Sequence, residues 1–278
     1  MSKIKLIGLD LDGTLLNDKK ELSDRNREAI EKAAAQGVIV VPATGRPLVG
    51  IKEEILSLPI KYALTANGAA IYEMESKNRI YEACFHWKEA LDIISMLQEY
   101  DVLEDCFIDG QGYVEKDKFE KLDTYVLDEN VKNYIRSSRI LVKHLIEHIW
   151  CEGCKVEKIT VNFKEENGIL LEEKEIKERF AKDFPECSVV KGIPTNLEIT
   201  TGAATKGNAI LKLGELLGIS KEEIMVCGDS QNDMDMMKAA GFSVAMGNAT
   251  PEIKAVADYV TLSNEESGVA AAIEKFVL

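Results

Sequence analysis

The sequence has no apolar run of the roughly 18 residues that a helix needs to cross a bilayer. It also has no internal repeat and no low-complexity linker. Basic residues are in deficit, because 34 Lys and Arg face 48 Asp and Glu, which gives a net charge of −14 over 278 residues. Nucleic acids and anionic membranes are bound by basic surface, so this balance argues against both as partners. The N-terminal ten residues hold one short apolar run ending in Asp10, which predicts a strand rather than a signal peptide.

Cysteine and histidine are sparse, with six Cys and three His. The Cys residues lie in dissimilar contexts, so we expect reduced thiols and a cytoplasmic protein. One cluster has zinc-ligand spacing: His144 and His148, four apart, are followed by Cys151 and Cys154. We favour the simpler interpretation, in which the two His lie on one exposed helix face, because short motifs often match by chance.

Hydrophobic residues at 46% and charged residues at 29% are typical of a globular protein. The length predicts one large domain or two smaller ones. The segments 4–10, 38–41 and 62–65 have the length and the apolar character of buried strands. They alternate with expected helices from Ser23 to Gly37 and from Pro47 to Pro59. This βαβαβ order predicts an α/β fold with a Rossmann-like, open, mostly parallel sheet.

The pattern changes between about residues 84 and 190, where the chain is more polar and less regular. Here we expect helices near 87–100, 139–149 and 169–183, a hairpin near 105–115 and a strand at 156–163. Strands at 197–200, 224–227, 243–246 and 259–261 then alternate with helices at 205–217, 232–240, 251–257 and 267–276. The simplest organisation is a core domain of residues 1–84 and 191–278, with an inserted α/β domain at 85–190.

Asp10 and Asp12 carry the strongest chemical signal, in the string Asp-Leu-Asp-Gly-Thr-Leu-Leu at the end of the first strand. Catalytic groups of open α/β sheets collect at the carboxyl ends of the strands. Residues two apart in extended backbone point the same way, and Gly13 then allows a sharp turn. Two neighbouring carboxylates repel unless a cation holds them, and Mg²⁺ is the natural hard cation for such a site.

A second acidic cluster, Asp229 and Asp233, follows the expected strand 224–227. A single Asp here would be an ordinary helix cap. Together with Asp10 and Asp12, however, the pair predicts one shared cleft.

Two smaller signals lie at strand-to-helix junctions. Thr44, Gly45 and Arg46 offer a hydroxyl and backbone N–H groups to an anion, and Lys206 offers a point charge to a phosphate. Taken alone, Thr44 is more simply a helix cap and Lys206 a surface lysine.

In this order and spacing, the residues resemble the haloacid-dehalogenase-like superfamily. Its four motifs are present as Asp10, Asp12 and Thr14, then Thr44, then Lys206, then Asp229 and Asp233. The strings Ala-Thr-Gly-Arg-Pro, Ala-Asn-Gly-Ala and Gly-Asp-Ser-Gln-Asn-Asp-Met look like the Cof-type sugar-phosphatase branch. The likeness covers essentially the whole chain. About 160 residues separate Thr44 from Lys206, far more than a crossover needs, and the resemblance identifies the excess as a C2-type α/β cap.

The resemblance also implies the roles of the site residues. Asp10 is the expected nucleophile and Asp12 the general acid and base. Mg²⁺ is expected on Asp10, Asp229, the backbone carbonyl of Asp12, and Asp233 in or just behind the first shell. The remaining roles are phosphate binding by Thr44, Gly45, Lys206 and Asn232, and substrate binding by Arg46, which can instead pair with an acid.

The function expected from these motifs is hydrolysis of small phosphate monoesters through an aspartyl-phosphate. Two alternatives stay open: a phosphomutase of the same fold, and a regulator that binds a phosphorylated metabolite without catalysis. The expected partner is a small phosphorylated metabolite, with no nucleic acid or membrane, and the chain is expected to be a monomer or homodimer.

Overall fold

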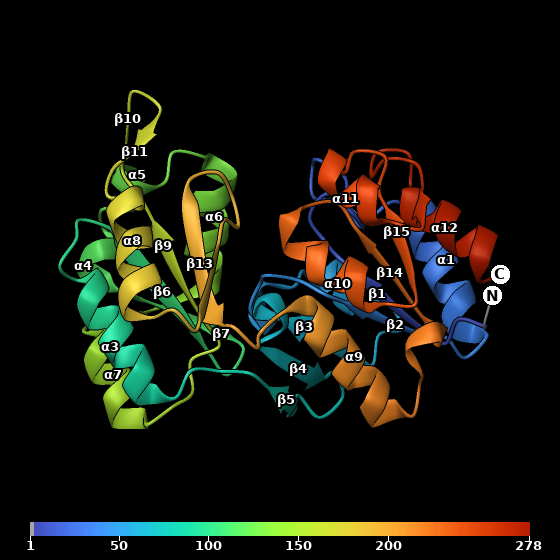
Figure 1. Cartoon of the computed structure of the whole chain (residues 1–278), viewed down its shortest axis with the longest axis horizontal. Helices are drawn as coiled ribbons and strands as arrows, with labels where there is room; N and C mark the ends of the chain where they lie inside the picture. Colours follow the sequence, from blue (N-terminus) through green and yellow to red (C-terminus); the bar gives the residue numbers. More distant parts are fainter. Residues whose placement is uncertain (1–2) are drawn as a thin grey trace. The chain divides into compact units, whose positions relative to one another are not determined.

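The computed structural model describes residues 3–278 and divides into two compact units (Figure 1). The first contains the chain up to residue 46 together with 51–82 and 205–278. The second contains 47–50 and 83–204. Among the described residues, no helix has the length and apolar character needed to cross a membrane.

A five-stranded parallel sheet forms the centre of the first unit, in the order β16-β15-β14-β1-β2. Its strands are β1 (Leu6–Leu9), β2 (Ile39–Pro42), β14 (Ile224–Gly228), β15 (Phe242–Ala245) and β16 (Tyr259–Val260). β1 pairs in parallel with β14 on one side and β2 on the other, and all four of its residues are buried. The predicted parallel α/β sheet is therefore confirmed, and the residues following β1, β2 and β14 share one edge of it.

Helices cover both faces of this sheet (Figure 1). α1 (Asp24–Ala35) packs with α12 (Gly268–Phe276), and α9 (Lys206–Leu217) packs with α10 (Met234–Ala239). The shorter elements are η3 (Lys221–Glu223), η4 (Gln231–Asp233) and α11 (Pro251–Val256). The hydroxyls of Ser23 and Thr205 accept N–H hydrogen bonds at the starts of α1 and α9, as expected of N-caps.

The expected third strand is present and its bridge to β2 is parallel, but its main partner lies in an antiparallel sheet. β3 (Tyr62–Thr65) belongs to an antiparallel sheet with β4 (Ala70–Glu73) and β5 (Arg79–Glu82), and it joins β2 only through a bridge between Ala43 and Leu64. The tight 3-10 turn η2 (Ala66–Gly68) sends the chain straight back, so no crossover helix follows β3. The expected helix from Pro47 to Pro59 is also reduced to η1 (Leu48–Gly50) and α2 (Glu53–Leu56).

The second unit is built on a six-stranded sheet in the order β12-β13-β9-β6-β7-β8. Its strands are β6 (Leu103–Ile108), β7 (Gln111–Glu115), β8 (Arg139–Val142), β9 (Lys158–Asn162), β12 (Cys187–Val190) and β13 (Asn196–Thr201). A main core packs α3 (Trp87–Leu97), α7 (Leu145–Glu152) and α8 (Glu173–Asp183) against it. A smaller core contains α5 (Leu122–Tyr125) and α6 (Glu129–Ser138), and the unit also contains α4 (Lys116–Phe119) and a hairpin of β10 (Glu165–Glu166) and β11 (Ile169–Leu170).

Three sequence expectations need correction in this unit. Residues 191–204 belong here and not to the first unit, because β13 pairs with β12 and β9. The helix expected over 139–149 is a strand followed by a helix, since β8 adds to β7 in parallel. The helix expected from residue 169 begins at Glu173, because Ile169 and Leu170 pair in the small hairpin. Helix α6, capped by Asp128, has no counterpart in the sequence prediction.

Candidate active site

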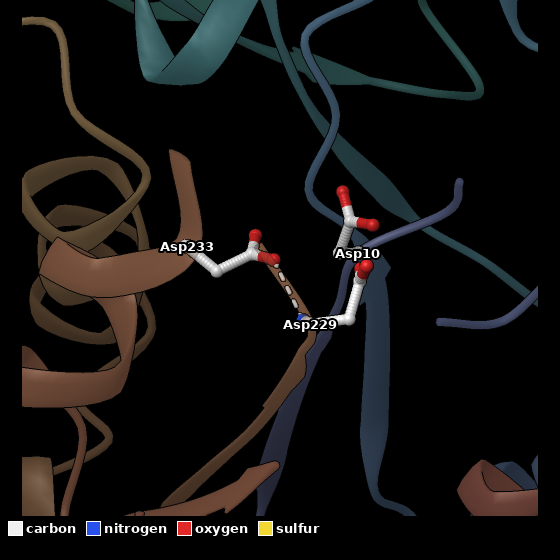
Figure 2. A group of neighbouring side chains, drawn as sticks. All are labelled: Asp10, Asp229 and Asp233. Carbon is white, nitrogen blue, oxygen red and sulfur yellow. Dashed lines mark hydrogen bonds between the residues drawn. The ribbon is translucent and has the colours of Figure 1, made fainter. Parts of the chain in front are cut away.

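Three carboxylates meet at the carboxyl edge of the parallel sheet (Figure 2). Asp10 follows β1, and its N–H donates to the carbonyl of Cys227 in β14 at 3.1 Å. Asp229 follows β14, and Asp233 ends the turn η4. One oxygen from each of these three side chains lies within 4.8 Å of the others. The adjacent strands thus bring together two motifs that are more than 200 positions apart in the sequence.

Lys206 fixes two of these carboxylates. Its Nζ lies 2.6 Å from Oδ1 of Asp10 and 2.7 Å from Oδ1 of Asp233, and its side chain has no exposed surface. Burial lowers the pKa of Lys206, but the charges of Asp10 and Asp233 outweigh it and the net direction is upward. Lys206 therefore stays an ammonium ion in the site.

Asp233 is held by both of its oxygens. Oδ1 accepts from Lys206, while Oδ2 accepts from the backbone N–H groups of Asp229 at 2.9 Å and Ser230 at 3.2 Å. The side chain is completely buried. A Cβ on Gly228 would lie 2.6 Å from the Cβ of Asp233, so only glycine fits there. The structure thus places Asp233 where it positions Lys206 and the Asp229 backbone.

Asp229 contacts the loop that follows Asp10. Thr14 donates its hydroxyl to Oδ1 of Asp229 at 2.9 Å. Gly13 has a left-handed φ of +91°, and a Cβ on it would lie 2.6 Å from Oδ2 of Asp229. Burial, with a contribution from the charge of Asp233, raises the pKa of Asp229 to about 6.

The donor set fits a divalent cation. Burial also raises the pKa of Asp10, and Asp233 and Asp229 add to this effect against the opposing charge of Lys206. Three carboxylates and one ammonium leave two uncompensated negative charges in a buried place, which is unfavourable without a cation. Carboxylate oxygens are the ligands that hard cations such as Mg²⁺ prefer. Because both oxygens of Asp233 already accept hydrogen bonds, Asp10 and Asp229 are the more suitable direct ligands.

Asp12 is paired with two cations and is not part of this group. Arg46 donates to it through Nε at 2.9 Å and Nη2 at 2.7 Å, a bidentate arrangement, and Nζ of Lys20 lies 3.0 Å from Oδ1. Burial raises the pKa of Asp12, but the hydrogen bonds and charges of Arg46 and Lys20 outweigh it and hold the pKa below its usual value. Of the two positions expected for Arg46, the structure shows the pairing with an acid. Nothing in the sequence marked Lys20.

Thr44 is buried in the turn that follows β2. Its N–H donates to the carbonyl of Leu64 at 2.9 Å, its carbonyl accepts from the N–H of Asn67 at 3.0 Å, and its hydroxyl accepts from the N–H of Arg46 at 3.2 Å. Gly45 lies in the same turn. The helix expected to start after this turn is not formed, because only the three-residue helical turn η1 (Leu48–Gly50) follows and α2 begins at Glu53.

Asn232 lies in the turn η4, where its Oδ1 accepts from the hydroxyl of Ser230 at 2.8 Å. This contact orders the turn that carries Asp233. A direct role of Asn232 toward phosphate stays a prediction.

The zinc hypothesis gains no support from the described residues. Within 3–278, Asp10, Asp229 and Asp233 form the one group of three or more side chains placed to share a metal. The ring of His148 packs on Tyr113 at 4.6 Å, and Cys151 is exposed. All six Cys are free thiols.

Comparison with known proteins agrees with this geometry. The profile of the haloacid dehalogenase-like hydrolases matches residues 7–273. A 5-amino-6-(5-phospho-D-ribitylamino)uracil phosphatase of Bacillus subtilis is 34% identical over 277 residues, covering 99% of this chain and 96% of the relative. Another phosphatase of Bacillus subtilis is 33% identical, covering 96% of this chain and 98% of the relative.

A solved structure supports the same assignment. A haloacid dehalogenase-like hydrolase from Bacillus subtilis superposes with a TM-score of 0.84 at 31% identity, covering 99% of this chain and all of the other. The profile spans nearly the whole chain, and the matching proteins are alike in sequence and fold. The chain therefore belongs to the haloacid dehalogenase-like hydrolase family and is an enzyme of the phosphatase kind.

Proposed function

We propose that this chain is a Mg²⁺-dependent hydrolase of small phosphate monoesters and carries the phosphoryl group on Asp10 between two chemical steps. The observation that supports this most is the buried Lys206, which holds Asp10 at 2.6 Å and Asp233 at 2.7 Å. A carboxylate fixed in this way at a strand end is a positioned nucleophile.

In the first step, a carboxylate oxygen of Asp10 attacks the phosphorus in line. The bond from phosphorus to the ester oxygen breaks, its electron pair goes to that oxygen, and Asp12 gives the leaving oxygen a proton. In the second step, a water oxygen attacks the phosphorus and Asp12 takes the proton from that water. The bond to Asp10 then breaks, which releases inorganic phosphate and restores the Asp10 carboxylate.

The metal is assigned to Asp10, Asp229 and the backbone carbonyl of Asp12, with Asp233 behind them. Bound there, Mg²⁺ supplies positive charge that neutralises the phosphoryl oxygens. We assign binding of the phosphoryl oxygens to the Thr44 hydroxyl, the Gly45 N–H and Lys206. Asn232 is assigned to orientation of the phosphate or of Asp233.

Arg46 and Lys20 favour the carboxylate form of Asp12, which is the form required as base in the second step. The first step requires the protonated form. An arriving phosphate dianion competes with Asp12 for the Arg46 guanidinium, and this competition releases Asp12 for its role as acid.

We infer the substrate class from the activities for which the relatives are named. Relatives from Bacillus subtilis with 34%, 30% and 27% identity are named as phosphatases of a ribitylaminouracil phosphate. That compound ends in a phosphorylated sugar alcohol, so we place sugar phosphates and sugar-alcohol phosphates first.

The test is release of inorganic phosphate from a panel of such esters with and without Mg²⁺. Asp10→Asn should remove activity by more than about a thousandfold, because the amide is no nucleophile, while leaving the fold intact. Asp92→Asn, on the exposed face of α3, is the matched control and should retain activity. Turnover by Asp10→Asn would contradict the proposal. An isomerised phosphate ester without free phosphate would identify a mutase, and tight binding without turnover would identify a regulator.

A further inference from the structure

The turn that follows β15, residues 246–250, contacts both loops that carry the acidic site. Met246 donates its N–H to the carbonyl of Gly228 at 3.1 Å, and Thr250 donates to the carbonyl of Asp229 at 3.0 Å. From the same turn, the side chain of Asn248 donates through Nδ2 to the carbonyl of Gly13 at 2.8 Å. One short turn thus binds the Asp229 loop through its backbone and the Asp10–Thr14 loop through a single side chain.

A second amide extends this connection. Oδ1 of Asn248 accepts from the N–H of Asn264 at 3.0 Å. The buried side chain of Asn264 donates to the carbonyl of Leu16 at 3.2 Å and to Oδ1 of Asp18 at 3.1 Å. The two Asn side chains therefore hold the loop at Gly13 and again at Leu16.

The turn itself is fixed. Gly247 donates to the carbonyl of Leu262 at 2.9 Å, and its own carbonyl accepts from Nζ of Lys254 at 2.6 Å. A Cβ on Gly247 would lie 2.7 Å from the nitrogen of Ser263, so the two segments are in close contact. Asn248 therefore projects from a turn that has its own contacts with Leu262, Ser263 and Lys254, outside the Gly13 loop.

We propose that Asn248 is a positioning residue that sets the separation between the loop of Asp10 and Asp12 and the loop of Asp229, and thereby the affinity of the site for a divalent cation. This inference rests on the proposed function. Gly13 is the weak point of its loop, since a glycine at φ +91° has little intrinsic preference for one conformation and lies directly against the Asp229 carboxylate. The Asn248 hydrogen bond restricts that freedom at the residue next to Asp12.

The test is calorimetric titration of the metal-free full chain with Mg²⁺ alone. Asn248→Asp keeps the acceptor for Asn264 but sets an oxygen against the Gly13 carbonyl, and we expect Mg²⁺ binding to weaken about tenfold. The substitution also adds a negative charge, which by itself would strengthen cation binding. Weaker binding would therefore report the disturbed contact between residue 248 and Gly13 rather than the added charge. Asn248→Ala should weaken binding in the same direction, and both variants should fold because Asn248 is exposed.

Asn17→Ala is the matched control, because Asn17 lies in the same loop and its side chain hydrogen-bonds within that loop, to Glu21. It should bind Mg²⁺ as the unchanged chain does. In phosphatase assays, both Asn248 variants should raise the Mg²⁺ concentration for half-activation about tenfold, with KM for the ester unchanged at saturating Mg²⁺.

This inference is overturned, and the proposed function left standing, if the chain without substitutions binds Mg²⁺ and releases phosphate and both Asn248 variants bind Mg²⁺ with the same affinity. An unchanged chain that neither binds Mg²⁺ nor releases phosphate would overturn both.

Discussion

Lys206 shows how much one buried side chain organises. It has no exposed surface and is paired with Asp10 and Asp233, while Asp229 lies in the same group. Removing a cation from a buried ion pair leaves charge that nothing compensates, which is far more costly than losing an exposed pair. The resemblance implies that Lys206 contacts phosphate and restrains Asp10, and the structure adds its ion pair with Asp233.

Lys206→Met should therefore destabilise the metal-free protein by about 3–5 kcal/mol, measured as the free energy of unfolding in urea at pH 7. The same substitution at Lys32, whose pair with Glu28 is exposed on α1, should change it by less than about 0.5 kcal/mol. Equal losses of unfolding free energy at the two positions would contradict the view that Lys206 compensates the buried charges of Asp10 and Asp233.

Residue identity alone predicted Asp10, Asp12, Thr44, Lys206, Asp229 and Asp233 as site candidates, because carboxylates, a hydroxyl and a lysine stood at the ends of expected strands. Lys20 and Asn248 carried no such signal. Their contacts with Asp12 and Gly13 depend on how a loop folds back and on a turn more than 200 residues away, and no local pattern encodes either.

The turn η2 (Ala66–Gly68) is the element that contacts both of the regions proposed to bind phosphate, the Thr44 turn and the start of α9. Its three residues have left-handed φ values of +49°, +59° and +92°. The N–H of Ala66 donates to Arg46 and that of Asn67 to Thr44. A Cβ on Gly68 would lie 2.2 Å from the carbonyl of Thr205, directly before Lys206. The turn thus contacts the Thr44 turn on one side and the start of α9 on the other.

Gly68→Ala tests this arrangement against Gly37→Ala, which has a similar φ of +86° but nothing within 4 Å of the added methyl. Gly37→Ala should cost about 1–2 kcal/mol of unfolding free energy from backbone strain alone. Gly68→Ala should cost about 1–3 kcal/mol more, because Thr205 must move, and should also lower kcat by displacing Lys206. Equal costs would show that the contact with Thr205 is unimportant.

Element prediction succeeded where hydrophobic periodicity was long and capped, as in α1, α9 and the parallel strands. It failed at β8, which was expected as part of a helix, and it did not identify the antiparallel partners of β3 and β13, although both were expected as strands. A short apolar run such as Ile140–Val142 has the same local appearance whether it joins a helix or a sheet, and tertiary pairing decides between them.

At the scale of the whole molecule, a net charge of −14 disfavours the approach of any anion, including a phosphate ester. The structure shows why the local field differs. Asp10, Asp229, Asp233 and Lys206 together carry two negative charges, which a divalent cation neutralises, and Asp12 with Arg46 and Lys20 carries one positive charge. With the proposed Mg²⁺ bound, the site carries net positive charge, so a small phosphate ester is compatible with an acidic protein.

Acid quenching shows whether Asp10 carries the phosphoryl group during turnover. The enzyme is mixed with Mg²⁺ and its best phosphate ester, quenched in acid within milliseconds and digested, and the peptide containing Asp10 is examined by mass spectrometry. We expect the mass of this peptide to increase by that of one phosphoryl group, located on Asp10 and missing from the Asp10→Asn variant. Turnover with no phosphorylated peptide at any quench time, or with the phosphoryl group on another residue, would contradict it.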